Sequence, residues 1–185
     1  MSDFNRIYKS ILTEGRIPSI FKKATPEEVA ERKTQYAKIQ SDEWVEKFMK
    51  RKDIKKNKDG SWDVDGNVIM KRNHFTKIPI KFNRVWGYFW CFDNALTSLE
   101  NCPVIVGESF DCAENKLTSL EHCAKKVGTF FSCSLNYLTS LDHCPTHVGG
   151  NFYCRHQYTS VEFTRDDVES RCKVGKGIFT KTLID

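Results

Sequence analysis

Apolar residues recur every 21 positions through the second half of this chain, and that spacing is its dominant pattern. The columns are Val85, Val106, Val127 and Val148; Phe89, Phe110, Phe131 and Phe152; Cys91, Cys112, Cys133 and Cys154; and Cys102, Cys123 and Cys144. Units of such an array bury their apolar faces against their neighbours, so the period predicts a solenoid. The register runs back to Val64 and on to Val168, which gives about five units beginning near residues 64, 85, 106, 127 and 148.

Within one unit, the sequence predicts a short strand followed by a turn. Phe110 and Cys112 alternate with Ser109 and Asp111, so we expect the first pair to point inward and the second pair toward solvent. Asn115 recurs as Asn94 and Asn136, and its side chain can bond backbone groups that no regular ladder satisfies. The strands of successive units would form one parallel sheet, and Gly128 would permit the bend into the next strand.

The segments on either side of the array carry helix signals. Apolar residues from Phe4 to Leu12 form one helical stripe. Thr25, Pro26 and Glu28 form a capping box for a helix to about Gln40, and Ser41 or Asp42 can cap a further helix through Trp44, Val45, Phe48 and Met49.

At the other end, Thr164 to Asp167 resembles a capping box for a short helix through Val168 and Cys172, which would cover the open stack. The predicted fold class is therefore α+β: N-terminal helices, then a short repeat solenoid with a parallel sheet, then a C-terminal cap. Its predicted segments are a helical, basic segment 1–58, the solenoid 59–168 and the cap or tail 169–185.

The repeats resemble two known groups of proteins. The order of Phe110, Cys112, Asn115 and Leu117 is similar to the L-x-L-x-x-N-x-L core of leucine-rich repeats. The units from Gly107 to Val127 and from Gly128 to Val148 share F-x-C-x-x-N-x-L-T-S-L-x-x-C, and they resemble repeats in proteins of T-even-type and related large tailed bacteriophages. This resemblance implies a solenoid fold and a phage origin, and it implies no particular activity.

Charge is distributed unevenly along the chain. Residues 1–84 hold 20 Lys and Arg against 12 Asp and Glu, whereas residues 85–185 hold 9 against 12. This asymmetry suggests two functional surfaces. The sequence carries no secretory signal and no apolar stretch near the roughly 20 residues that span a bilayer, so we expect a host-cytoplasmic or virion protein that neither is secreted nor contacts a membrane.

Eight cysteines raise the questions of metal binding and disulfides. Zinc needs four sulfurs around one point, and a column along a solenoid cannot supply them. Without an export signal, buried free thiols are favoured over disulfides. We therefore expect neither a metal nor a cofactor.

His122 and His143 lie in register beside Glu100, Glu121 and Asp142. Such a cluster is compatible with acid–base catalysis, but a solvated surface column is the simpler interpretation because no nucleophile or phosphate loop accompanies it. We expect no enzymatic activity.

The solvent-facing strand residues are the favoured binding site, because solenoids meet partners through such surfaces. Ordinary strand-forming residues on a solvated surface are an equally simple explanation. The candidate partner-binding residues are Tyr88, Trp90, Ser109, Asp111, Thr129, Ser132, Asn151, Tyr153 and Arg155. The aromatic members are of the type that dominates binding energy in protein interfaces. A protein partner, from a host or a phage, is therefore the leading hypothesis, in which the protein modulates or inhibits a host protein.

A basic run offers a nucleic-acid site as an alternative, since Lys and Arg neutralise phosphates. Its members are Lys47, Lys50, Arg51, Lys52, Lys55, Lys56 and Lys58. Trp44, Phe48 and Trp62 flank the run and could stack on bases. Packing of Trp44 and Phe48 against the solenoid is the competing use, and the run itself could be a linker or an exposed helix end.

A second alternative is a virion component. In T-even-type phages, internal head proteins carry a short amphipathic packaging segment that a phage protease removes after a hydrophobic-x-Glu triplet. Leu12-Thr13-Glu14, followed by Gly15, is similar to that triplet. The resemblance implies that residues 1–14 are a packaging signal, with Leu12, Glu14 and Gly15 at the processing site.

Overall fold

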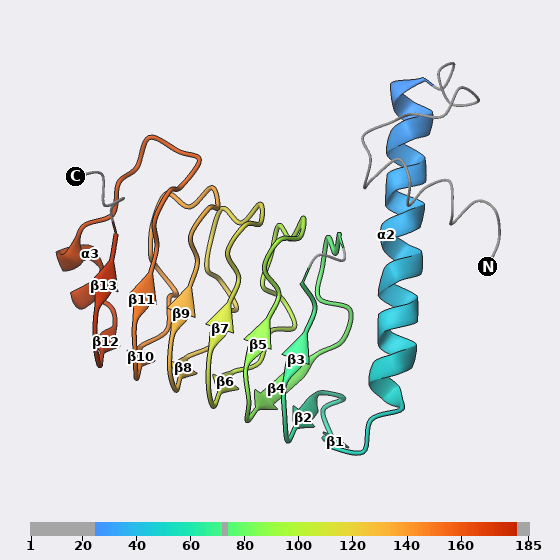
Figure 1. Ribbon diagram of the computed structural model, residues 1–185, viewed down its shortest axis with the longest axis horizontal. Coiled ribbons are helices and arrows are strands. Elements are labelled where there is room, and N and C mark those ends of the chain that lie inside the picture. Colours follow the sequence, from blue (N-terminus) through green and yellow to red (C-terminus); the bar gives the residue numbers. More distant parts are fainter. Residues whose placement is uncertain (1–24, 72–73, 181–185) are drawn as a thin grey trace. The chain divides into compact units, whose positions relative to one another are not determined.

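A computed structural model describes residues 25–71 and 74–180 (Figure 1). The chain divides after Tyr36 into two units, and helix α2 (Pro26–Met49) begins in the first unit and ends in the second. The stripe from Phe4 to Leu12 and the processing site at Leu12, Glu14 and Gly15 lie outside the described residues.

Helix α2 starts as its sequence predicts but runs further. Thr25 Oγ1 accepts a hydrogen bond from Glu28 N at 3.2 Å, and Thr25 N donates to Glu28 Oε2 at 2.8 Å, which confirms the capping box. The predicted break at Ser41 or Asp42 is wrong, because α2 is continuous to Met49. No Pro or Gly interrupts this stretch, so Ser and Asp are tolerated inside the helix.

Residues 62–180 form the predicted solenoid, in which each turn contributes one short strand to each of two sheets (Figure 1). Sheet A is seven-stranded, and its strands in order are β1 (Ile54–Lys56), β2 (Trp62–Val64), β4 (Phe82–Val85), β6 (Ile105–Val106), β8 (Lys126–Val127), β10 (His147–Val148) and β12 (Lys173–Val174). Sheet B is six-stranded, with β3 (Val68–Ile69), β5 (Phe89–Trp90), β7 (Phe110–Asp111), β9 (Phe131–Ser132), β11 (Phe152–Tyr153) and β13 (Ile178–Phe179). Only the β1–β2 pair is antiparallel.

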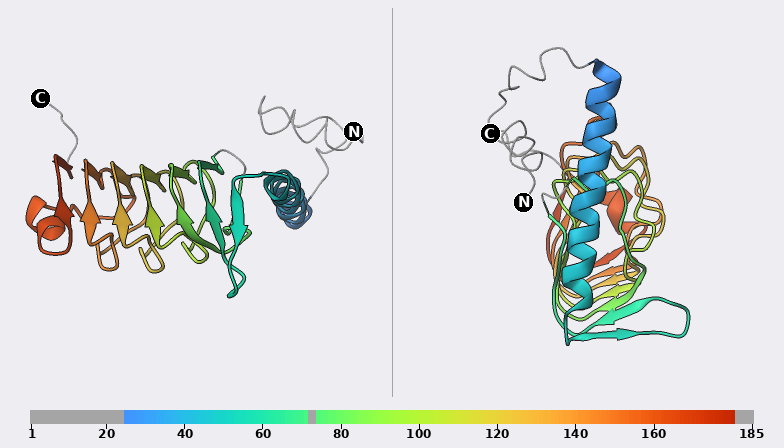
Figure 2. Two further views of the ribbon diagram at one scale, coloured as in Figure 1. Left: turned by 90° about the horizontal axis from the view of Figure 1, so that it is seen from below. Right: turned by 90° about the vertical axis from the view of Figure 1, so that its right-hand side faces the viewer.

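The predicted columns superimpose when the stack is viewed end-on (Figure 2). Successive Phe rings of β5, β7, β9 and β11 meet edge to face with centroids 5.0–5.6 Å apart. Each such contact contributes about 0.5–1.5 kcal/mol beyond the burial of the rings. The Val and Cys columns fill the rest of the interior, so the repeat period is a core period.

A column of glycines at the corner between the two sheets allows neighbouring turns to approach closely. A Cβ on Gly128 would lie 1.8 Å from the carbonyl oxygen of Gly107, and one on Gly149 would lie 2.2 Å from that of Gly128. The reason for glycine here is therefore contact with the previous turn, rather than the freedom to bend that the sequence suggested.

Asparagine side chains bond the backbone of adjacent turns, as predicted. Asn115 Nδ2 donates to the carbonyl oxygens of Cys91, Cys112 and Ala113 at 3.0–3.2 Å, and its Oδ1 accepts from Leu96 N at 3.0 Å. Asn94 and Asn136 repeat this arrangement, and Gln157 replaces Asn in the next turn.

Backbone hydrogen bonds run in opposite directions in the two sheets. In sheet A, the amide of Gly128 donates to the carbonyl of Val106 in the preceding turn. In sheet B, the amide of Phe131 donates to the carbonyl of Asn151 in the following turn. The first strand of sheet B therefore directs carbonyl oxygens toward the N-terminal end of the stack.

The end of α2 and the hairpin β1–β2 close the N-terminal end. Trp44 and Phe48 pack on the core, where Phe48 contacts Phe82 edge to face at 5.6 Å, which confirms that they pack on the solenoid. Trp44 Nε1 donates to Ile69 O at 2.8 Å, and Arg51 Nη1 donates to Asn67 O at 2.6 Å. These side chains thus satisfy outward-facing carbonyls of sheet B.

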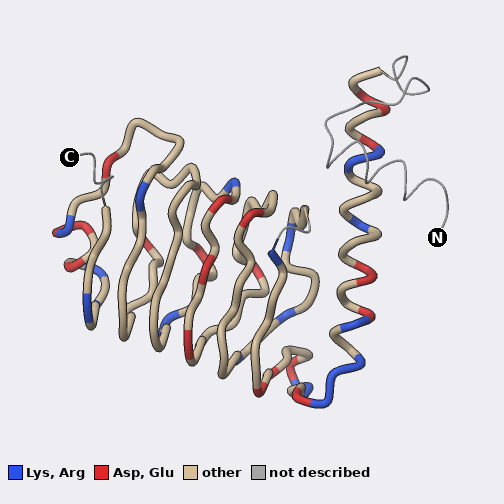
Figure 3. The backbone as a smooth tube through the Cα atoms, in the orientation of Figure 1, with Lys and Arg blue, Asp and Glu red and all other residues tan. Residues whose placement is uncertain are grey.

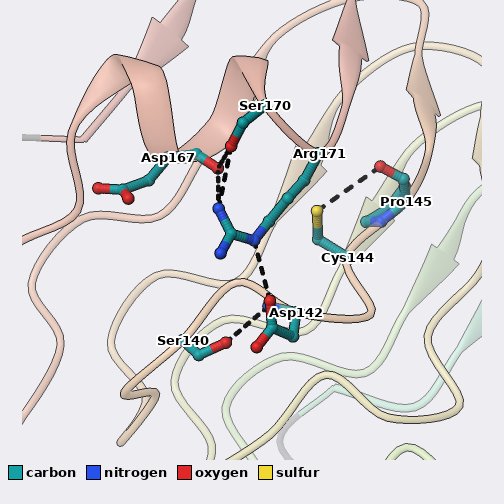
Figure 4. A network of polar contacts seen from close by, with 7 residues as sticks. All are labelled: Ser140, Asp142, Cys144, Pro145, Asp167, Ser170 and Arg171. Carbon is teal, nitrogen blue, oxygen red and sulfur yellow. Dashed lines mark hydrogen bonds and ion pairs between the residues drawn. The ribbon is translucent and has the colours of Figure 1, made fainter.

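Helix α3 (Arg165–Glu169) begins at the predicted capping box of Thr164 and Asp167, and its Val168 is fully buried. Arg171, just after it, donates from Nε to Asp142 Oδ1 at 3.0 Å and from Nη1 to Asp167 O at 3.0 Å (Figure 4). The chain then adds β12 and β13 in register with β10 and β11, so part of the predicted tail is a further solenoid turn.

One detail of the predicted register is wrong. Tyr158 was aligned with Leu138, which is fully buried, but Tyr158 is 58% exposed and its ring lies 5.1 Å from that of Tyr137. The period of 21 therefore persists to Tyr158, and the array shortens only after it.

Candidate functional site

The outer face of sheet B carries an unbroken column of outward side chains. Strand register places Ile69, Trp90, Asp111, Ser132, Tyr153 and Phe179 side by side on successive strands. The residues that precede each strand form a second column of Asn67, Tyr88, Ser109, Phe130, Asn151 and Gly177. We call the surface made by these two columns and the residues just after the strands the sheet B face.

Aromatic rings gather at the β5 end of the sheet B face. Tyr88 and Trp90 are stacked with ring centroids 4.0 Å apart, and Phe92 lies 6.2 Å from Trp90. Lys71 Nζ lies over both Trp90 and Phe92, at 5.5 and 5.7 Å from the ring centroids. The indole Nε1 of Trp90 is shielded from solvent and has no hydrogen-bond partner among the described residues.

A second aromatic group lies at the β11–β13 end. Tyr153 stacks on Phe179 at 4.7 Å, and Phe130 meets Tyr153 edge to face at 6.1 Å. The guanidinium of Arg155 lies 4.8 Å from the Phe179 ring centroid. Asn151 fixes the edge of this group by donating from Nδ2 to Tyr153 Oη at 2.9 Å. Both ends of the face therefore present a cation held over stacked rings.

The middle of the face consists of small polar side chains. Ser109 Oγ and Thr129 Oγ1 are 2.7 Å apart, and Asp111 Oδ1 accepts from Ala113 N at 3.0 Å. Burial raises the pKa of Asp111 above its usual value. Ser132 is only 8% exposed, so the prediction that it faces solvent is wrong. Its place between Asp111 and Tyr153 leaves it covered by larger neighbours.

The structure brings the nine predicted partner-binding residues to one side of the solenoid. Thr129 belongs to the corner rather than to the column of Ser109, whose equivalent one turn later is Phe130. The sequence analysis missed Phe92, Phe130, Phe179 and Lys71. Phe130 could have been found by adding 21 to Ser109, but Phe179 could not, because helix α3 lengthens the last interval to 26 residues.

The basic run from Lys47 to Lys58 is distributed over several elements rather than forming a linker. It includes the end of α2, the strand β1 and the hairpin turn. Arg51 is paired with Asp53, and Lys50 with Glu46 at 2.8 Å. Lys56 lies over the ring of Trp62 at 5.8 Å. Lys47, Lys52, Lys55 and Lys58 are exposed.

The histidine column lies at the surface. His122 and His143 both adopt left-handed backbone conformations, with φ of 65°, in place of Asn101 one turn earlier. His122 Nε2 is 3.9 Å from Glu121 Oε1, and both side chains are more than half exposed. Asp142 is held by Arg171 and by its own turn (Figure 4), so it belongs to the C-terminal cap.

All eight cysteines are free and buried. Burial raises the thiol pKa to about 11 for Cys144 and to about 12 for Cys154 and Cys172. Cys112 Sγ donates to Ser132 O at 3.2 Å. Within residues 25–71 and 74–180, no three His, Cys, Asp or Glu side chains are placed to hold a metal ion.

In the same described part of the chain, no helix has the length and apolar character needed to cross a bilayer. Comparisons of this chain with protein families, curated proteins and solved structures found no match.

Proposed function

We propose that the protein is a non-enzymatic interaction module that binds a protein partner through the sheet B face. The observation that supports this proposal is the pair of stacked aromatic groups, each with a cation over its rings, at the two ends of a polar strip. Trp, Tyr and Arg side chains supply most of the energy at protein interfaces, and both ends of the face hold them.

The dimensions of the face favour a protein over a small molecule. Six strands spaced about 4.8 Å apart give a surface roughly 24 Å long. Its two aromatic groups are too far apart for one small ligand to reach both. A folded protein or an extended segment of one can contact both groups and the strip between them.

A bacterial host protein is the partner that we propose, and the expected consequence is modulation or inhibition of that protein. This part of the proposal rests on the resemblance of the repeats from Gly107 to Val148 to those of T-even-type phage proteins.

The test starts from the tagged full chain, which is used to purify a partner from phage-infected bacteria. The dissociation constant of the purified pair is then measured for wild type and for Trp90→Ala and Tyr153→Ala. Loss of a hot-spot aromatic residue should weaken binding by about 30-fold or more, which corresponds to roughly 2 kcal/mol.

Tyr158→Ala is the matched control, because Tyr158 is an exposed and stacked aromatic residue on another limb of the solenoid. It should leave the dissociation constant unchanged, and all three variants should keep the wild-type melting temperature within a few degrees. Unchanged affinity in both Trp90→Ala and Tyr153→Ala would refute the assignment of the sheet B face.

A further inference from the structure

The outer face of sheet A carries a row of cations that the sheet B proposal does not use. Strand register places Arg84, Ile105, Lys126, His147 and Lys173 side by side on successive strands, and Lys125 lies beside Lys126. The lower edge of the stack in Figure 3 shows basic residues recurring near β8 and β12. We call this surface the sheet A face.

These cations are exposed and uncompensated. Among residues 25–71 and 74–180, none of Arg84, Lys125, Lys126 and Lys173 forms an ion pair. Adjacent strands are about 4.8 Å apart, so the row from Arg84 to Lys173 extends for roughly 19 Å. Unpaired cations in a line fit a linear polyanion.

An exposed tryptophan stands at the N-terminal end of the row. Trp86 is 54% exposed and occupies the corner position where later turns have glycine. The backbone of the corner, rather than the Trp86 side chain, packs on the next turn, since a Cβ on Gly107 would meet the Trp86 carbonyl at 2.0 Å. The indole is therefore not needed for the packing of the corner.

Trp86 forms one wall of an open pocket of about 500 Å³. The other lining residues are Lys52, Asp53, Ile54, Lys55, Asp63 and Asp65. Asp53 is paired with Arg51, which lowers its pKa, and Asp63 Oδ1 accepts from Asn83 Nδ2 at 2.7 Å. The pocket thus combines an aromatic wall with carboxylate acceptors, and two lysines lie at the same opening.

We propose that the sheet A face binds single-stranded nucleic acid, with a base stacked on Trp86 and phosphates along Arg84, Lys125, Lys126 and Lys173. Aromatic stacking combined with a basic track is how proteins hold unpaired strands. The pocket carboxylates would repel a phosphate, but they can accept hydrogen bonds from the amino group of a base. They also disfavour an anionic membrane, which would have to approach the same carboxylates.

This site differs from the one suggested by the basic run. Only Lys52 and Lys55 of that run line the pocket, whereas Arg51 is held by Asp53 and Asn67. The inference does not depend on the proposed protein partner, because the two faces share no residue.

The test measures fluorescence anisotropy of a labelled 12-nucleotide oligo-dC with the full chain at 50–200 mM NaCl. Four phosphate contacts should give a slope of log K against log[NaCl] near −3, since each contributes about −0.7 on a single strand. Trp86→Ala should weaken binding by about 5- to 150-fold, the range measured for stacking on one base. Lys126→Glu/Lys173→Glu should also weaken binding and reduce the slope to about −1.4.

The control variants are Tyr158→Ala and Lys116→Glu, which remove an exposed aromatic ring and an exposed cation from the limb that follows the Asn turn. Both should bind like wild type, and circular dichroism should show that every variant keeps the wild-type fold. Absence of oligo-dC binding by wild type at 50 mM NaCl would overturn the proposal, as would equal binding by Trp86→Ala and the double variant. Binding to phosphatidylglycerol vesicles without binding to oligo-dC would identify a membrane surface and also overturn it.

Discussion

The asparagine column provides a direct measure of how the turns of the solenoid are held together. Asn136 is fully buried, and its Nδ2 donates to the carbonyl oxygens of Cys112, Cys133 and Ser134 at 3.0–3.2 Å. Its Oδ1 accepts from the amide of Leu117, which is itself fully buried. The substitution Asn136→Ala removes all four bonds and adds no new partner.

The expected loss follows from the groups left behind. A buried polar group without a partner costs about 1–3 kcal/mol, and the amide of Leu117 becomes such a group. The three carbonyls lose a donor as well, but Cys112 O keeps the one from Asn115 at 3.2 Å. We therefore expect Asn136→Ala to lower the free energy of unfolding by about 3 kcal/mol.

Equilibrium unfolding in urea, followed by circular dichroism, measures this loss. With a slope of about 1–3 kcal/mol per molar urea, the midpoint should fall by roughly 1–3 M. Gln157→Ala is the matched control, because Gln157 is only half-buried and its donor contacts are longer, at 3.1–3.5 Å. It should cost about 1 kcal/mol. Equal losses in the two variants, or a loss below 1 kcal/mol for Asn136→Ala, would refute the reasoning.

Three further outcomes are expected. Gly128→Ala should cost at least about 3 kcal/mol in urea unfolding, because its Cβ would meet a backbone carbonyl that cannot move aside, whereas Gly60→Ala, which meets no atom within 4 Å, should cost only about 1 kcal/mol for its positive φ; similar losses would contradict this. Leu135→Gly should raise stability by about 0.5–1 kcal/mol, because Leu135 has a φ of 54° that a bulky side chain disfavours; a lower melting temperature would count against it. Stability should decline as pH rises from about 9 toward 12, because unfolding lets the thiols of Cys144, Cys154 and Cys172 ionise near 9 while burial keeps their folded pKa at about 11–12; a urea midpoint equal at pH 8 and pH 10.5 would exclude this linkage.

The sequence predicts the interior of this solenoid better than its ends. Phe110, Cys112 and Asn115 recur with their neighbours because each contacts its own equivalent in the next turn, so a fixed period marks the core directly. The second sheet gave no such signal. A strand such as Ile105–Val106 has one inward residue, and two positions are too few to show alternation.

The ends escaped prediction because there the contacts stop being periodic. Strand β1 is rich in lysine and pairs antiparallel with β2, so it resembles a linker rather than a repeat. Strand β13 repeats the core only after the insertion of α3, which breaks the spacing of 21. The candidate face was located from strand alternation, but Phe130 was missed because an outward phenylalanine looks like a core residue.

The opposite directions of the hydrogen bonds in the two sheets affect how the protein can vary in size. Each internal turn accepts from one neighbour and donates to the other in both sheets, so its peptide dipoles largely cancel along the stack. A longer array therefore accumulates no charge at its ends, unlike a growing α-helix. Internal turns are interchangeable units, and the number of turns is fixed by where Trp44 and Arg51 on one side and α3 on the other close the stack. The array can gain or lose whole repeats of 21 residues while both caps keep their contacts, which makes its length an evolutionary variable independent of its ends.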